Sequence, residues 1–349
     1  MDEYEVFFAT NRSYERSRAK PVFGDRFHPD GPQFFRVGTA RVRHRGGRPD
    51  DAFEMTGYDV EEETPRSGGK KEVPGSRRLF ASLAERMKSD EVDVLVFIHG
   101  YANDFKNTME RAACLAHHWR IGLGDASRHA IPFAFSWPSD GSMTPFIAYQ
   151  DDRQDAAFSG FAMARSLMKL VEFLHSNKSA RCEQRIHLVS HSMGNWALRH
   201  MVLSLRAIFD RQRLPRVFDN VFLMAADEDN DAFETEFKLG LLPQLAHAVH
   251  LYYASGDLAL SISDNTKGLP DRLGATGPRT MDGLDSKVIA IDCLDVCSTY
   301  KIQHARHQYY RIREEIFRDV RQVLAGFSPD QVEGRITIQP GRRYRLKSI

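Results

Sequence analysis

The sequence predicts an α/β protein built on a mostly parallel β-sheet with helices on both faces. Three observations support this prediction. Apolar runs recur between about residue 92 and residue 293, helical patterns lie between most of them, and the stretch 186–201, IHLVSHSMGNWALRHM, reads as a strand, a tight turn and a helix. Strands that are apolar on both faces and alternate with helices are typical of a parallel sheet covered on both sides.

The first 78 residues are expected to form strands and a polar loop that belong to the main domain or pack on it. EVFFATNR (5–12) and FFRVGTARVRH (34–44) have the composition of strands, and a stretch rich in Pro and Gly separates them. Residues 46–78 are polar and rich in Gly, Pro and charge, which predicts a long loop. The basic run RVRHRGGR (41–48) is interpreted as a solvated loop.

The segment 79–327 is predicted to be the core of the α/β domain, and residues 328–349 a C-terminal tail. Strands are expected at VDVLVFIHG (92–100), IPFAFSWP (131–138), IHLVSHS (186–192), VFLMAAD (221–227), AVHLYYAS (248–255) and KVIAIDC (287–293). Helices are expected at 77–89, 155–175, 195–210 and, after the last strand, 307–327.

Composition excludes several classes of function. The 48 Lys and Arg nearly balance the 47 Asp and Glu, so no global field favours nucleic acid. The acidic N-terminus does not resemble a signal peptide, and no apolar run is long enough to span a membrane. Four cysteines are too few for a disulfide framework in a chain of this length. These features predict a cytoplasmic protein.

The turn at 190–194, SHSMG, has the pattern of a nucleophile elbow. Such a turn needs small residues two positions before and two after the nucleophile. Ser192 has Ser190 and Gly194 in those positions, whereas Ser190 would have Leu188 before it, and a leucine would clash. A preceding apolar strand and a following amphipathic helix supply the context that the motif requires. Ser192 is therefore predicted to be the nucleophile.

The loop after VFIHG is predicted to complete an oxyanion hole. Gly100 ends that strand and lets the backbone approach a substrate closely. The amides of Tyr101 and of Met193, the residue after the nucleophile, are the expected donors, aimed at the charge that develops during acyl transfer.

Several motifs together resemble a bacterial α/β-hydrolase family of unknown function, within an esterase- and lipase-like superfamily. They are HGYANDF, FSWPSDG, SHSMGN, YYASGDLAL followed by RLG, and HQYY, and ATNR near residue 10 is similar to the N-terminal segment of that family. The resemblance covers about residues 4–325. It implies the α/β-hydrolase fold and a Ser-Asp-His triad, without an established substrate.

The acid and the base follow the nucleophile in the chain order Ser, Asp or Glu, His of this fold. Asp257, after AVHLYYAS, matches the usual position and the pattern of the family. Asp227 and Asp229, after VFLMA, remain alternatives that would otherwise cap a helix or line the cleft. His304 and His307 are the only histidines after the last strand, and His307 matches the family pattern His-x-Tyr.

A metal or cofactor is not expected. Cys293, Cys297, His304 and His307 have the residue types of a zinc site, but their spacing differs from the familiar arrangement. Phe105, Trp137 and Tyr149 are candidates for substrate contact, with structural packing as the alternative interpretation.

The expected function is cofactor-free hydrolysis of a small-molecule carboxylic ester, with Ser192 as nucleophile, His307 as base and Asp257 as its partner. A thioesterase or amidase would use the same triad, and a non-catalytic binding module with this fold is the alternative from another class.

Overall fold

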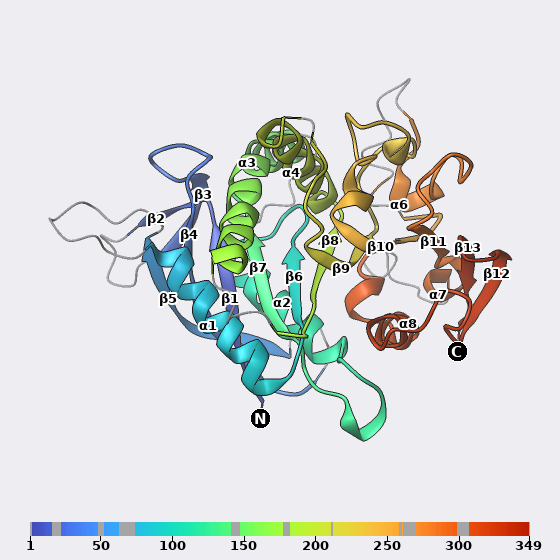
Figure 1. Ribbon diagram of the computed structural model, residues 1–349, viewed down its shortest axis with the longest axis horizontal. Helices are drawn as coiled ribbons and strands as arrows, with labels where there is room; N and C mark the ends of the chain where they lie inside the picture. The colour runs from blue at the N-terminus through green and yellow to red at the C-terminus, as the bar shows by residue number, and fades with distance from the viewer. Residues whose placement is uncertain are drawn as a thin grey trace, which may run out of the picture.

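The computed structural model describes residues 2–15, 22–47, 52–62, 74–140, 147–176, 182–210, 212–257, 260, 270–298 and 307–348. Its centre is a large twisted sheet that runs across the molecule (Figure 1). In the described residues the strand order is β12-β13-β11-β10-β9-β8-β6-β7-β1-β4-β5, and β2 and β3 form a separate hairpin.

The middle of the sheet is parallel throughout, as the sequence predicts. Every pair of neighbours from β1 to β13 is parallel. The parallel strands are β1 (Glu3–Thr10), β7 (Ile131–Ser136), β6 (Val94–Ile98), β8 (Ile186–His191), β9 (Phe218–Met224), β10 (Ala246–Tyr253), β11 (Val288–Asp292) and β13 (Arg343–Leu346). The carboxyl ends of these strands consequently meet at one edge of the sheet, which is where α/β proteins place their ligands.

Helices cover both faces of the sheet. Along β6, Val94 and Ile98 face one core cluster while Leu95 and Phe97 face the other, because side chains alternate along a strand. Helices α1 (Gly75–Asp90), α3 (Ile147–Ser176) and α4 (Gly194–Ile208) pack on the first cluster, and α2 (Phe105–His118) and α8 (Glu314–Leu324) pack on the second. Shorter helices are η1 (Gly124–Ala126), η3 (Ala232–Glu234), η4 (Leu242–Gln244), α6 (Leu273–Thr276), α7 (Leu294–Ser298) and η6 (Tyr309–Arg311).

The N-terminal region contains more strands than the sequence suggests. The expected loop at 46–78 is wrong over β5 (Phe53–Glu62), which pairs antiparallel with β4 (Arg36–His44). Met55, Tyr58 and Val60 pack against the core, but a register shift disturbs the alternation that would have revealed the strand. The basic run is likewise strand as far as His44. The hairpin of β2 (Arg12–Glu15) and β3 (Val22–Phe27) was not predicted.

The C-terminal segment extends the sheet instead of standing apart from the core. β13 pairs with β11, and β12 (Arg335–Gln339) forms the outer strand (Figure 1). The final helix also differs from the expectation, because α8 begins at Glu314 and His307 lies in a turn before η6. Among the described residues, no helix combines the length and the apolar character that crossing a membrane requires.

Candidate active site

The turn between β8 and α4 places Ser192 in a strained backbone conformation. Its φ is 53°, a left-handed value that residues other than glycine rarely adopt. The turn also packs tightly, because a Cβ on Gly194 would lie 2.6 Å from the carbonyl oxygen of His99 and one on Gly100 would lie 2.8 Å from Cβ of Ser192. These features are those of a nucleophile elbow, in which strain holds the serine at the tip of the turn.

Ser190 occupies a different environment two residues earlier. It is a residue of β8 and pairs with Ile98 on one side and Leu223 on the other. Its side chain is fully buried, and its hydroxyl is among the buried polar groups of the described chain that lack a hydrogen-bond partner. Only Ser192 of the two serines therefore lies in the turn.

A buried carboxylate and a histidine meet beside this turn. Oδ2 of Asp257, in the turn after β10, lies 2.7 Å from Nδ1 of His307, 50 positions further along the chain. The side chain of Asp257 is fully buried and that of His307 is 12% exposed. A carboxylate in this position selects the ring tautomer with the proton on Nδ1, which leaves Nε2 as an acceptor. The structure thus brings Asp257 and His307 together; His304 lies outside the described residues.

Neighbouring aromatic residues fix the segment that carries His307. The Nε2 atom of His191 lies 3.0 Å from the carbonyl oxygen of His307, and the His191 ring stacks on Tyr310 at 4.2 Å. The hydroxyl of Tyr309 donates to the carbonyl of Tyr252 and accepts from the amide of Ala225. Burial lowers the pKa of His191 well below its ordinary value, so this ring stays neutral. His307 is therefore anchored next to the residue that precedes Ser192.

Asp227 and Asp229, the alternative acids, face cations instead of a histidine. Asp227 is buried and accepts a hydrogen bond from the hydroxyl of Tyr149, with Arg153 at 3.5 Å and Arg272 at 3.6 Å. Asp229 lies 2.9 Å from Lys238 and 3.1 Å from Arg272. Both carboxylates are thus paired with cations in a charged cluster after β9.

The loop after β6, which carries Tyr101, is held by a stack of buried rings and by Asn103. The rings of His99 and Trp137 stack at 4.7 Å, and Nε1 of Trp137 donates to the carbonyl of His99. The Asn103 amide donates to the carbonyls of Gly100 and Tyr101 at 2.9 and 2.8 Å. Because β6 and β8 are neighbours, Tyr101 and Met193 lie in adjacent loops at the same edge of the sheet.

Arg12, which the sequence analysis did not single out, reaches this loop from the N-terminal region. Its guanidinium is buried and donates to the carbonyls of Asn103 (2.6 Å) and Ser139 (2.9 Å) and to the hydroxyl of Ser136 (2.9 Å). Burial lowers the pKa of this arginine to about 10. The motif ATNR contains Arg12, but nothing local in the sequence shows that it contacts loops more than 90 residues away.

The three candidates for substrate contact have different surroundings. Tyr149 lies beside Tyr101, with ring centres 5.8 Å apart, at the predicted oxyanion loop. Trp137 is fully buried against His99, and Phe105 packs on Phe8 and Phe23. Contact with substrate stays a prediction for all three, and Tyr149 is the one whose ring lies against that of Tyr101.

The cysteines near His307 belong to the core. Cys293 and Cys297 are buried on one face of the sheet, and burial raises the pKa of Cys293 well above its ordinary value. A thiol in this environment is held protonated, whereas a metal ligand must lose its proton.

Comparisons with known proteins identify one family and two similar proteins. A family model described as "Alpha/beta hydrolase of unknown function (DUF900)" matches residues 78–325. An uncharacterized protein of Nostoc sp. (strain PCC 7120), alr1448, is 26% identical over 172 residues, a match that covers 41% of this chain and 42% of the relative. The crystal structure of the lin2722 product of Listeria innocua matches with 11% identity and a TM-score of 0.32, covering 73% of this chain and 99% of that one.

The family match spans more than half of the chain and includes both the elbow and the Asp257–His307 pair. The chain belongs to this family of α/β hydrolases, and hydrolase chemistry is what its fold supports.

Proposed function

We propose that the protein is a serine hydrolase that cleaves a carboxylic ester of a small molecule through Ser192, His307 and Asp257. The observation that carries the proposal is the 2.7 Å contact between a fully buried carboxylate and Nδ1 of His307, which is anchored to His191 beside the turn that holds Ser192 at a φ of 53°. A serine, a histidine and a carboxylate gathered at the carboxyl edge of a parallel sheet suit acyl transfer.

In the proposed mechanism, Nε2 of His307 takes the proton of the Ser192 hydroxyl while Oγ forms a bond to the ester carbonyl carbon. The amides of Tyr101 and Met193 donate to the resulting oxyanion; Met193 is the N-cap of α4, where backbone N–H groups have no partner within the helix. The imidazolium then protonates the leaving alcohol as the carbon–oxygen bond breaks. Water, deprotonated by His307, releases the acid from Ser192 in the second half of the reaction.

Labelling with a fluorophosphonate probe tests the nucleophile directly. The expected result is one covalent adduct on Ser192, located by peptide mass spectrometry, and no adduct in Ser192→Ala. Ser190→Ala is the matched control, because it removes a buried hydroxyl that has no hydrogen-bond partner from the strand before the turn. This control is expected to label and to keep most of the activity.

Two outcomes would contradict the proposal. If the folded wild-type protein does not label, the result would favour a non-catalytic module. If Ser190→Ala loses labelling as completely as Ser192→Ala, the assignment of Ser192 as the nucleophile would be wrong. The leaving group is then identified with p-nitrophenyl esters of graded chain length and acyl-CoA thioesters. Faster turnover of the thioesters would replace the ester assignment with a thioesterase.

A further inference from the structure

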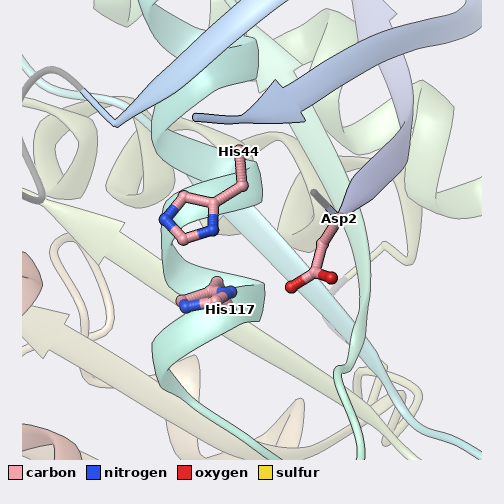
Figure 2. Close-up of side chains that lie close together, drawn as sticks. All are labelled: Asp2, His44 and His117. Carbon is pink, nitrogen blue, oxygen red and sulfur yellow. The ribbon is translucent and has the colours of Figure 1, made fainter. Parts of the chain in front are cut away.

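A second group of histidine and carboxylate side chains lies at the opposite edge of the sheet from Ser192. It consists of Asp2 before β1, His44 at the end of β4 and His117 in the last turn of α2. β1 is parallel to β7, so Asp2 lies where the parallel strands begin. Figure 2 shows the carboxylate and the two imidazole rings turned toward one another from three separate elements.

The three side chains lie close enough for one ion to draw them together. One ligand atom from each lies within 4.8 Å of the others. A tetrahedral zinc ion with bonds of about 2.0–2.1 Å places its ligand atoms roughly 3.4 Å apart, so closure needs shifts on the order of 1 Å. Asp2 is exposed and His44 is only partly buried, so both side chains have room to make these shifts.

The backbone around the group is already fixed. The amide of His44 donates to the carbonyl of Asp2 at 2.9 Å, which ties the start of β1 to the end of β4. The rings of His44 and His117 are 4.4 Å apart. The hydroxyl of Tyr4 lies 2.6 Å from Nδ1 of His117, and the hydrogen bond between them orients this ring.

The chemistry of the three side chains also suits a cation, because a metal ion binds to the nitrogen lone pairs of imidazole rings and to carboxylate oxygens. Two imidazole nitrogens and one carboxylate oxygen are a ligand set typical of Zn²⁺ and related divalent transition ions.

We propose that Asp2, His44 and His117 bind one divalent transition ion of the zinc class. The ion joins the start of β1 and the end of β4 to the last turn of α2. It therefore fastens the N-terminal strands, which precede the segment matched by the family model, to a helix of the hydrolase core. The site is structural, and it stands apart from the proposed hydrolytic function.

The test uses the full-length protein without a histidine tag, first stripped with a chelator. Zn²⁺ binding is measured by isothermal titration calorimetry, and the unfolding midpoint by circular dichroism with and without Zn²⁺. We expect one ion per chain and a rise of a few degrees in the midpoint, because a ligand that binds only the folded state stabilises it. Asp2→Asn and His44→Gln, both at accessible positions, should each raise the dissociation constant roughly tenfold or more.

His118→Gln is the matched control. His118 is the next residue of α2, but its ring stacks on Phe317 at 4.4 Å and is not a member of the group. It should bind zinc like the wild type. Three outcomes would overturn the proposal. They are zinc binding that is unchanged in both Asp2→Asn and His44→Gln, an equal loss of zinc affinity in His118→Gln, and no zinc binding to the folded wild-type protein. Ester hydrolysis is not a readout, so failure here leaves the proposal for Ser192 standing.

Discussion

The two edges of the sheet carry similar side chains in different arrangements. At the carboxyl edge, the fully buried Asp257 contacts one nitrogen of His307, next to the strained turn of Ser192. At the opposite edge, the exposed Asp2 stands near two rings, those of His44 and His117, without a nucleophile among the three. A single buried carboxylate orients a proton acceptor, whereas an open carboxylate with two imidazoles suits a cation. Geometry and burial, more than residue type, distinguish the two chemistries.

Replacement of one histidine at each edge should give the largest difference in kcat between the two edges. We expect His307→Ala to lower kcat for a p-nitrophenyl ester by a factor on the order of 10⁶, the loss typical of removing the base of a triad. His44→Gln should leave kcat unchanged, since it lies at the other edge. Similar losses in the two variants would mean that the edges are not functionally distinct.

The carboxylates should follow the same division with a smaller effect. Asp257→Asn is expected to lower kcat by about 10⁴, because an amide favours the wrong tautomer of the histidine. Asp227→Asn should be milder, since its partners are Tyr149 and two arginines. Steady-state measurements of kcat on both variants decide between Asp257 and Asp227. A larger loss of kcat in Asp227→Asn would make Asp227, which follows β9, the acid of the triad.

Arg12 connects the N-terminal strands to the carboxyl edge, and its effect should be smaller again. Arg12→Lys keeps the charge but cannot reproduce the donations to Asn103, Ser139 and Ser136. We expect kcat to fall by about 10- to 100-fold with little change in KM, because the loop of Tyr101 is displaced while the substrate still binds.

Arg36→Lys is the control for this variant. Arg36 is also buried in the N-terminal strands, where it donates to the backbone carbonyl of Arg12. An equal fall in kcat in the two variants, or a change confined to KM, would show that Arg12 acts through general stability or substrate binding and not through the loop.

The sequence predicted the parts of the molecule whose signals are local. The apolar runs of β6 to β11 identify buried strands, and the small residues around Ser192 identify the turn. Asp257 and His307 depended on chain order and on resemblance to a family. The sequence did not predict β5 and β12, because these are the two outermost strands of the sheet and carry polar faces. Contacts of Arg12, and the approach of Asp2, His44 and His117, join residues far apart in the chain and leave no pattern in the spacing.

The last predicted effect concerns the stability of the carboxyl edge and not a rate. Burial raises the pKa of Glu228, beside Asp227, to about 7, even though Arg199 lies 3.3 Å away and opposes the shift. The folded protein therefore holds a proton that the unfolded chain, with an ordinary value of 4.5, releases at lower pH. Between about pH 4.5 and 7 the folded state binds more protons, so the free energy of unfolding falls as pH rises. The expected loss is about 3 kcal/mol over this whole range of pH.

Glu228→Gln should remove this slope, because glutamine does not ionise. Urea unfolding at pH 5 and pH 8 measures it, and the wild type should lose stability between the two values while the variant changes less. An equal slope in both proteins would assign the pH dependence to other groups. Zinc added at pH 8 should stabilise both proteins alike, since Glu228 follows β9 at the carboxyl edge while Asp2 precedes β1 at the other. If the two edges are independent, their contributions to the free energy of unfolding add: one is lost as the pH rises, and the other is gained when the metal binds.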